Sequence, residues 1–412
     1  MIKVINICTS NTGGAGNAVD RINNVLNQFS DSWVISLAGK SKNKSIVLPG
    51  FYFFRLKIYR YLKHTFYKKI NKVFKNKYNF YNYGETNNYI NPSRLLKHFP
   101  FQPDILIVHF TAHFINFKTI YEIQKITGCS ILFNIVDTSF MTGGCHWSWD
   151  CNGYKFSCSN CPAIKSKKIK DLSNRNFLEK KFFINKMKFS VNVSSSFAFK
   201  QVQKSFLLKG KKPSFIYYPI DQKFFKPSKK INKTNRKNIF FGTQDLNNPS
   251  KGVIYFVKAI EYLCKIIDYD QKKLIKINIA GKKIVLPFNK EIEINYLGTL
   301  PIDKLIKEYS NSDIFVCSSI EDNGPMMINE SLMCGTPVVA FDTGISSDLI
   351  NNETGYLAKN MSHTDLAEGI KELLFNFNKK TFRHSTRGFA INNYGNKKIR
   401  NEWENLIKTL NK

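Results

Sequence analysis

Short apolar runs that alternate with helical periodicity recur along the chain. The first run, VINIC at 4–8, is followed by the glycine-rich stretch SNTGGAGN at 10–17. Apolar residues then repeat at helical spacing, at Ala18, Val19, Ile22, Val25, Leu26 and Phe29. This order predicts a buried strand, a glycine turn and an amphipathic helix. Strands that alternate with helices in this way favour a parallel sheet covered on both faces.

The same pattern extends over two regions. Strands are predicted at 33–37, 104–110 and 130–136, and again at 239–242, 275–281, 292–297, 313–318 and 337–341. The segment 217–238 between them is rich in Pro, Lys and Asn, and a chain of 412 residues suits two domains. We therefore predict two doubly wound, Rossmann-like α/β domains, 1–215 and 216–385, facing a cleft. A C-terminal helix at 386–412 is expected to pack back on the first domain.

Charge narrows the classes of partner. The formal net charge is +32, which favours anionic partners such as nucleic acid, acidic lipid headgroups or phosphorylated substrates. An AT-rich genome, which encodes much Lys, Asn and Ile, is an alternative explanation. Met1 leads directly into a predicted strand, and no apolar run is long enough to span a membrane. We expect a cytoplasmic protein.

The stretch IEDNGPMMINESLMCGTPVVAF at 320–341 gathers three acids around one short predicted helix. Pro325 suits the first helical position, and Gly335 suits the helix end. The loop before the helix lies at the carboxyl end of a predicted strand, where the helix N-terminus favours a phosphate. Carboxylates accept hydrogen bonds from sugar hydroxyls, so the pattern suits a sugar joined to a nucleoside diphosphate. The alternative is that Glu321 and Asp322 only complement the helix dipole.

This stretch resembles the acidic signature of the family 4 retaining glycosyltransferases, which have the GT-B fold. The signature has two acids separated by seven residues and then Cys-Gly-Thr-Pro-Val-Val, and it is matched by Asp322, Glu330 and the residues that follow. The resemblance covers most of the chain, through GGAG, YYPIDQKFF, FFGT…KG, YLGTL and TGYLA. It implies the GT-B fold and a nucleotide-sugar donor.

The resemblance also implies roles for residues of the second domain. Glu330 would bind the nucleoside ribose, and either Asp322 or Glu321 would contact the donor sugar. The backbone of Gly324, Pro325, Met326 and Met327 would hold the donor's sugar and phosphate. Lys251 in SKG matches the diphosphate-binding lysine of the family. The arginine that usually precedes it is absent from GTQDLNN at 242–248.

In the first domain, the glycine loop and the ends of two strands carry the candidate residues. Gly13, Gly14 and Gly16 let the backbone approach a ligand, and by resemblance they border the donor diphosphate and the acceptor. A tight strand-to-helix turn is the alternative.

Many family members have a histidine directly before an aspartate near the reacting carbon. Val136 takes that place here, which leaves Asp137 as the expected active-site residue. His109 and His113 are candidates for the lost histidine role, or are structural.

The implied reaction is transfer of a sugar to a hydroxyl of a glycan acceptor, with retained configuration and no catalytic metal. By resemblance alone, its setting is bacterial surface polysaccharide synthesis, such as capsule or O-antigen. The alternatives are a phosphorylase, a nucleotide-sugar hydrolase or epimerase, and, in another class, a nucleic-acid-binding protein with a zinc site of four cysteines.

The segment 51–83 interleaves aromatic residues with Lys and Arg, and 32–84 contains no acid. Such a segment favours an anionic membrane surface, which would place the enzyme at the inner face of the plasma membrane beside a lipid-linked acceptor. A solvated helix pair is the main alternative, and nucleic acid, which we do not expect as a partner, could use the same features.

A cysteine cluster interrupts the first domain at 141–165. Its four thiols are Cys145, Cys151, Cys158 and Cys161, and four thiols within one short loop can bind one structural zinc ion. A branch of family 4 carries a similar TGGCH…C…C..CP cluster, but that resemblance does not supply a metal. Two disulfides and four unbridged thiols are the alternatives; a reducing compartment disfavours the first.

Overall fold

The computed structural model describes residues 1–71, 78, 80–82, 84–85, 90–165, 167–228, 235–282, 286–288, 291–376 and 379–412. Part of the basic-aromatic segment 51–83 therefore lies outside the described residues. The chain forms two compact units. The first comprises Met1–Ser194, Ala198–Tyr217 and Arg400–Lys412, and the second Ser195–Phe197 and Tyr218–Ile399.

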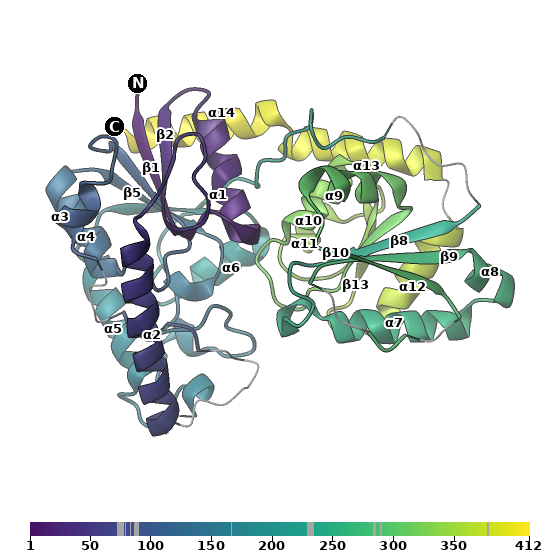
Figure 1. Ribbon diagram of the computed structural model, residues 1–412, viewed down its shortest axis with the longest axis horizontal. Coiled ribbons are helices and arrows are strands. Elements are labelled where there is room, and N and C mark those ends of the chain that lie inside the picture. Colours follow the sequence, from purple (N-terminus) through teal and green to yellow (C-terminus); the bar gives the residue numbers. More distant parts are fainter. Residues whose placement is uncertain are drawn as a thin grey trace. The chain divides into compact units, whose positions relative to one another are not determined.

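The first unit is built on a seven-stranded parallel sheet with strand order β3-β2-β1-β4-β5-β6-β7 (Figure 1). Its strands are β1 (Lys3–Ser10), β2 (Asp31–Ala38), β3 (Ser45–Val47), β4 (Ile105–Val108), β5 (Ser130–Ile135), β6 (Phe189–Val193) and β7 (Ser214–Phe215). All four side chains of β4 are buried, which is typical of a parallel strand covered on both faces.

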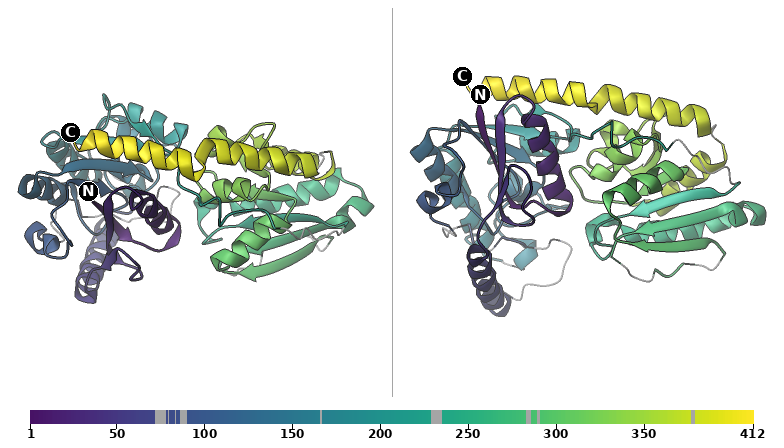
Figure 2. Two further views of the ribbon diagram at one scale, coloured as in Figure 1. Left: turned by 90° about the horizontal axis from the view of Figure 1, so that it is seen from above. Right: turned by 45° about the horizontal axis from the view of Figure 1, so that its top comes forward.

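The helices of this part of the chain are α1 (Gly13–Leu26), α2 (Gly50–Asn71), α3 (Pro92–Leu96), α4 (Phe117–Thr127), α5 (Leu172–Ile184) and α6 (Ser196–Lys204). Helix α1 buries Val19, Ile22 and Leu26 and packs on β1 and β2. Figure 2 shows that the long helix α2, which contacts β2, projects beyond the sheet of its unit.

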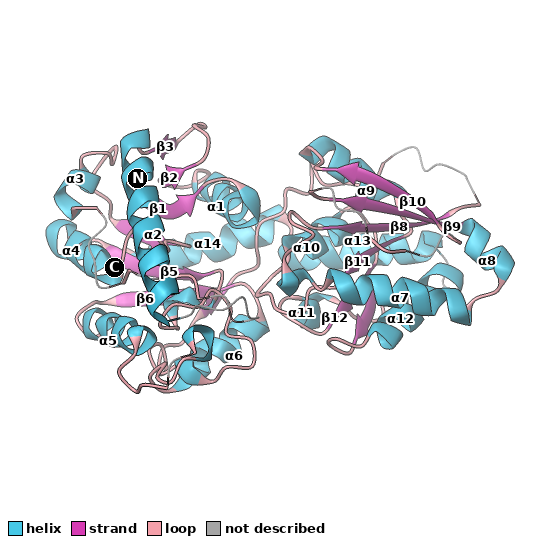
Figure 3. Ribbon diagram, turned by 60° about the horizontal axis from the view of Figure 1, so that its bottom comes forward, coloured by secondary structure: helices cyan, strands magenta, loops and turns pink. Residues whose placement is uncertain are grey.

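The second unit is built on a six-stranded parallel sheet with order β10-β9-β8-β11-β12-β13 (Figure 3). Its strands are β8 (Lys237–Gly242), β9 (Ile275–Ala280), β10 (Glu293–Gly298), β11 (Ile314–Cys317), β12 (Val338–Phe341) and β13 (Gly355–Ala358). The side chains of β11 and β12 are all buried.

The helices that follow in the chain are α7 (Val253–Ile266), α8 (Tyr269–Leu274), α9 (Ile302–Asn311), α10 (Met326–Met333), α11 (Ser346–Leu349), α12 (His363–Phe375), α13 (Lys379–Tyr394) and α14 (Asn396–Leu410). Helices α7 and α12 pack together, and α10 contacts α9 and α13 (Figure 1). The sheet of this unit is therefore covered on both faces.

The two parallel sheets with their helices confirm the predicted α/β fold class. Four strands were not predicted, namely β3, β6, β7 and β13. In β6 the reason is visible, because the polar Asn192 is buried and donates to Asn134 Oδ1 at 2.8 Å, which breaks the apolar run. Helix α10 begins at Met326, one residue later than the pattern predicts. The single helix expected at 386–412 is divided between α13 and α14 at Gly395, whose amide bonds the carbonyl oxygen of Ile391.

Candidate active site

The strand order of the second sheet reverses between β8 and β11. In open parallel sheets, ligands bind outside the carboxyl ends of the strands at such a switch point. The segment after β8 carries Lys251, in the short 3-10 helix Pro249–Lys251. The segment after β11 carries Glu321 and Asp322 and leads into α10. The fold thus brings both predicted donor-binding segments to the same edge of the sheet.

Backbone contacts hold these two segments together. The hydroxyl of Ser318 donates to the carbonyl oxygen of Lys251 at 2.9 Å, and the amide of Ile320 donates to the carbonyl oxygen of Ser250 at 2.8 Å. Gly252 lies between them at φ 60°, and a Cβ there would come within 2.0 Å of the oxygen of Ser318. Only glycine permits this approach, so Gly252 is part of the frame of the site.

Lys251 and Asp322 form an ion pair. The Nζ of Lys251 lies 2.5 Å from Oδ2 of Asp322, and Oδ1 of Asp322 accepts from the amide of Gly324 at 2.9 Å. Burial acts to lower the pKa of Lys251, but the charge of Asp322 and this hydrogen bond outweigh it and raise the pKa above its ordinary value. The ammonium is therefore charged. It is held by Asp322, in the loop that leads into α10.

Helix α10 adds its N-terminus and a buried acid. Met326 and Met327 open the helix, and the N-terminus of a helix attracts anions. Met327 also covers the end of β8, since its Cε lies 3.1 Å from where a Cβ of Gly242 would stand. Glu330 is only 4% exposed, and its Oε2 accepts from the hydroxyl of Tyr309 at 3.0 Å. A buried carboxylate held in this way is preorganised to accept further hydrogen bonds.

Sequence reasoning missed two buried amides in the same stretch. Asn323 and Asn329 are both fully buried, and neither side-chain amide has a hydrogen-bond partner in the part of the chain that the structure describes. Buried amides without partners are rare outside functional sites or bound water. The sequence did offer a signal, because Asn323 directly follows Asp322 and Asn329 directly precedes Glu330.

In the first unit, the glycine loop follows β1 at the switch point between β1 and β4. Gly13 begins α1 at φ 77°. Gly16 packs so closely that a Cβ would lie 2.3 Å from the carbonyl carbon of Asn11, whereas Gly14 is exposed with nothing within 4 Å of its missing Cβ. Gly16 therefore serves the strand-to-helix turn, and Gly14 has empty space where a side chain would stand.

Asp137 follows β5 and is 1% exposed. Its Oδ1 accepts from the amide of Ser139 at 2.6 Å, and its Oδ2 lies 3.2 Å from Nδ1 of His146. Burial acts to raise the pKa of Asp137, but the charge of His146 and the hydrogen bond from Ser139 outweigh it and hold the pKa below its ordinary value. The sequence therefore indicated the acid correctly as a residue at a strand end, but not its partner.

His146 is the half-exposed member of this pair. Its ring lies 5.3 Å from the ring of Phe110, 4.7 Å from that of Trp147 and 5.8 Å from that of Tyr81. These aromatic walls and the buried carboxylate orient the imidazole. The segment between Asp137 and His146 folds back on itself. The spacing of the two residues in the sequence therefore does not predict that they form a pair.

His109, by contrast, is a structural histidine. It is fully buried, its Nε2 bonds Oδ1 of Asn6 at 3.0 Å, and its Nδ1 bonds the amide nitrogen of Asn134 at 3.1 Å. Since the amide nitrogen of Asn134 donates, Nδ1 accepts and the ring carries its proton on Nε2. Burial lowers the pKa of His109 to about 3, so the ring is neutral. Of the two roles considered for His109, the structure thus fits the structural one. The ring bridges the buried side chains of Asn6 and Asn134.

His113 lies near the Asp137 site but does not form its ion pair. Its φ is 64°, and its ring lies 4.5 Å from the ring of Tyr81, which also neighbours His146. His113 therefore shares the Tyr81 ring with His146.

Replacing Asp137 with asparagine tests the pair. Because its pKa is lowered in the folded state, the carboxylate stabilises the fold above its unfolded pKa of about 3.9, and this contribution disappears as pH falls through the lower folded value. We expect Asp137→Asn to lower the free energy of unfolding at neutral pH by about 2 kcal/mol. The difference from wild type should vanish in acid. Urea unfolding at several pH values measures it, and a difference that stays constant into acid would contradict the ion pair.

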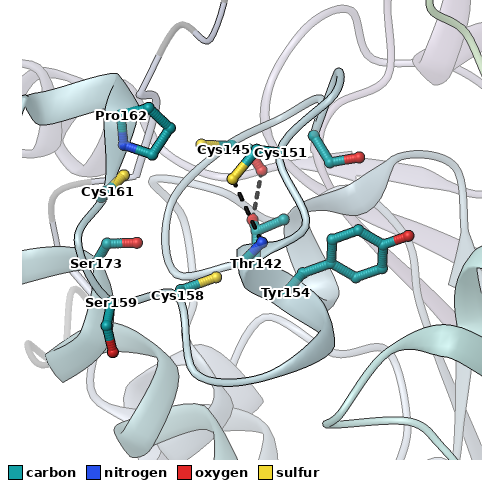
Figure 4. Close-up of a pocket in the computed structure, with 11 residues that line it drawn as sticks. Thr142, Cys145, Cys151, Tyr154, Cys158, Ser159, Cys161, Pro162 and Ser173 are labelled. Carbon is teal, nitrogen blue, oxygen red and sulfur yellow. Dashed lines mark hydrogen bonds between the residues drawn. The ribbon is translucent and has the colours of Figure 1, made fainter. Parts of the chain in front are cut away.

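The four cysteines of the cluster lie together in the segment after Asp137. Cys145, Cys151, Cys158 and Cys161 line one small cavity, with Thr142 donating from its hydroxyl to the carbonyl oxygen of Cys145 at 2.6 Å (Figure 4). A hydrogen bond between Cys145 and Cys161 lowers the pKa of the second thiol and raises that of the first. None of the four is in a disulfide.

Comparisons with known proteins agree with this picture. Residues 221–385 match the family model described as glycosyl transferases group 1. An uncharacterized glycosyltransferase of Haemophilus influenzae is 23% identical over 194 residues, which is 44% of this chain and 52% of that protein. The chain thus spans about half the length of the curated relative that it matches.

Several solved structures resemble the whole chain. Sucrose-phosphate synthase from Thermosynechococcus elongatus has a TM-score of 0.65 at 13% identity, with 99% of each chain covered. The Anabaena protein HepE in complex with UDP-glucose has a TM-score of 0.62 at 13% identity, covering 99% of this chain and 100% of HepE. These findings show that the chain has the two-domain GT-B fold, that its second unit matches the glycosyl transferases group 1, and that a transferase enzyme is supported.

Proposed function

We propose that this protein is a retaining glycosyltransferase that moves a sugar from a nucleoside diphosphate sugar to a hydroxyl of a glycan acceptor. The observation that carries the proposal is the pairing of Lys251 with Asp322 at the switch point of the second sheet, at the start of α10. This is a cation and a helix N-terminus beside sugar-binding carboxylates. The match of residues 221–385 to the glycosyl transferases group 1 supports the same assignment.

Each group has a distinct task in this proposal. Lys251 and the first amides of α10 bind the diphosphate, and Glu330 accepts hydrogen bonds from the ribose hydroxyls. Glu321 or Asp322 accepts from hydroxyls of the donor sugar. Asp322 already holds the Lys251 ammonium, so the buried cation has an anionic partner before the donor binds.

The chemistry requires charge stabilisation above all. The bond between the anomeric carbon and the phosphate oxygen breaks, and a bond to the acceptor oxygen forms on the same face of the sugar. The acceptor proton moves to the departing phosphate oxygen. Lys251 and the helix N-terminus stabilise the negative charge that develops on the diphosphate. With these fixed positive groups in place, we propose that no metal ion is needed for catalysis.

The experiment presents the protein with UDP-, GDP- and ADP-sugars and a set of glycan acceptors, with and without EDTA. Release of the nucleoside diphosphate identifies the donor, and nuclear magnetic resonance of the product gives its anomeric configuration. Retained configuration in a glycan product supports the proposal. Free sugar as the only product would indicate a hydrolase, and sugar phosphate formed only with added orthophosphate would indicate a phosphorylase.

We further propose that α2 binds an anionic membrane surface and so places the enzyme beside a lipid-linked acceptor in surface polysaccharide synthesis. Phe51 and Phe54 are 67% and 64% exposed, and Tyr61 and Leu62 are exposed as well. Among the described residues, no helix has the length and apolar character of a membrane span. Exposed rings in a stretch of sequence with many cations and no acid suit insertion at the level of lipid headgroups.

Replacing both rings tests this surface. We expect Phe51→Ser/Phe54→Ser to lower co-sedimentation with anionic vesicles roughly tenfold, because two apolar side chains no longer leave water on binding. Phe224→Ser removes an exposed ring in the second unit and is the matched control. Equal sedimentation with neutral vesicles, or no change in the double variant, would rule out this role of α2.

A further inference from the structure

The segment after Asp137 has little regular structure of its own. Between Met141 and Lys165 it contains only the 3-10 turns Gly153–Lys155 and Pro162–Ile164. The part around Cys161 packs in a small apolar cluster of Phe80, Cys161, Ala163, Ile164 and Leu172, whereas Met141, Tyr154 and Cys158 join the main core of the first unit. The part around Cys161 thus has only a small core of its own, and a further cross-link would add to its order.

Four thiols converge inside this loop. Cys145, Cys151, Cys158 and Cys161 line a single cavity of about 20 Å³, and Figure 4 shows the four side chains around it. A cavity of that size admits one atom about as large as a water molecule. The other five cysteines of the chain lie elsewhere and do not line this cavity.

Burial raises the pKa of Cys151 and Cys158, and two backbone amides act against this effect by donating to their sulfur atoms. The amide of Gly143 donates to Sγ of Cys158 at 3.2 Å, and the amide of Gly153 donates to Sγ of Cys151 at 3.4 Å. Gly153 borders both sulfur atoms, since a Cβ there would lie in ordinary contact, 3.4 Å from Sγ of Cys151 and 3.8 Å from Sγ of Cys158. Amide donors of this kind stabilise sulfur in its anionic, metal-binding form.

We propose that these four cysteines bind one zinc ion in a tetrahedral, structural site. Within the described part of the chain, no three Cys, His, Asp or Glu side chains already stand in a metal-holding group. Binding therefore requires the four thiols to turn inward toward the centre of the cavity that they line. Four thiolates complete the coordination of zinc and leave no position for substrate, so the role is structural.

The site would act on the Asp137 pair through the backbone. His146 directly follows Cys145, and its carbonyl oxygen accepts from the amide and the hydroxyl of Thr138 at 3.1 and 3.0 Å. On the other side of the loop, Nζ of Lys180 donates to the carbonyl oxygens of Ser139 and Thr142 at 2.6 and 2.9 Å. Zinc bound by Cys145 would fix the backbone directly before His146. It would thereby hold the His146 ring against Asp137.

Elemental analysis of the full chain, purified under reducing conditions without added metal, tests the proposal. We expect about one zinc per chain and four thiols that resist alkylation until a chelator is added. Two disulfides within the cluster, found by mass spectrometry together with little zinc, would overturn it. Four thiols that alkylate at once without zinc would overturn it equally.

Variants sharpen the result. Cys158→Ser should lower zinc content at least about tenfold, whereas Cys264→Ser, a buried cysteine outside the cluster, should keep it. If Cys158→Ser does not fold, cobalt substitution of the wild-type protein decides the matter, since tetrahedral thiolate ligation gives intense visible absorption. Cobalt that binds without this spectrum would contradict the site. Nucleotide binding by the second unit should survive loss of zinc, which separates this proposal from the proposed function.

Discussion

Lys251→Met is expected to lower sugar transfer by about 10²–10³-fold, because the departing diphosphate loses the cation that stabilises its charge. Lys251→Arg keeps the charge and should retain more activity than Lys251→Met. Release of nucleoside diphosphate under saturating donor measures both. Equal loss in the two variants would point to a geometric requirement and not to charge.

The same substitution has a structural cost that must be separated from catalysis. Without Lys251, the carboxylate of Asp322, with only 10% of its side chain exposed, is left without its ion pair. A buried charge that loses its partner costs about 3 kcal/mol of stability. Lys251→Met/Asp322→Asn removes both charges, so we expect it to regain stability in a urea melt but not activity. Recovery of transfer in the double variant would show that Lys251 acts only through the fold.

Glu330→Gln is expected to weaken binding of the nucleoside diphosphate by about 10–100-fold, because hydrogen bonds from ribose to a carboxylate are worth about 1.5–3 kcal/mol. Binding of inorganic pyrophosphate should not change, because it has no ribose. Calorimetric titration with both ligands makes the distinction. A parallel loss for both would mean that the variant has disturbed the site as a whole.

Tyr309→Phe is the matched control for Glu330. It removes the hydroxyl that donates to Oε2 at 3.0 Å but leaves the carboxylate in place. We expect a smaller loss than in Glu330→Gln. If Tyr309→Phe weakened binding more than Glu330→Gln, orientation of the side chain would matter more than its charge.

Much of the fold followed from periodicity, because buried parallel strands are short apolar runs that differ sharply from the helices between them. Strands β1, β4, β5, β11 and β12 all lie where those runs predict them. Strand β6 was not predicted because the polar Asn192 interrupts its apolar run. Asn192 is buried against Asn134 of the neighbouring strand β5, a contact that the sequence alone does not give. The division between α13 and α14 at Gly395 was not predicted, because a single glycine does not by itself end a helical pattern.

The candidate site was predictable where its residues are close in sequence, and not where the fold assembles them. Glu321, Asp322 and Glu330 share one stretch, so their spacing and the helix start pointed to a donor site. The contact of Lys251 with Asp322 depends on the adjacency of β8 and β11, which only the strand order gives. In the sequence His146 is only the histidine that ends TGGCH, because its pairing with Asp137 depends on the path of an irregular loop.

One titration tests the central claim, that the second unit binds a nucleoside diphosphate sugar at the switch point between β8 and β11. Wild-type protein is titrated calorimetrically with UDP, GDP and ADP, beside Lys251→Met/Glu330→Gln. We predict that at least one nucleotide binds the wild type with Kd between about 1 μM and 1 mM, and that the double variant, still folded, binds none measurably. Failure of all three nucleotides to bind, or unchanged binding by the double variant, would contradict the donor site.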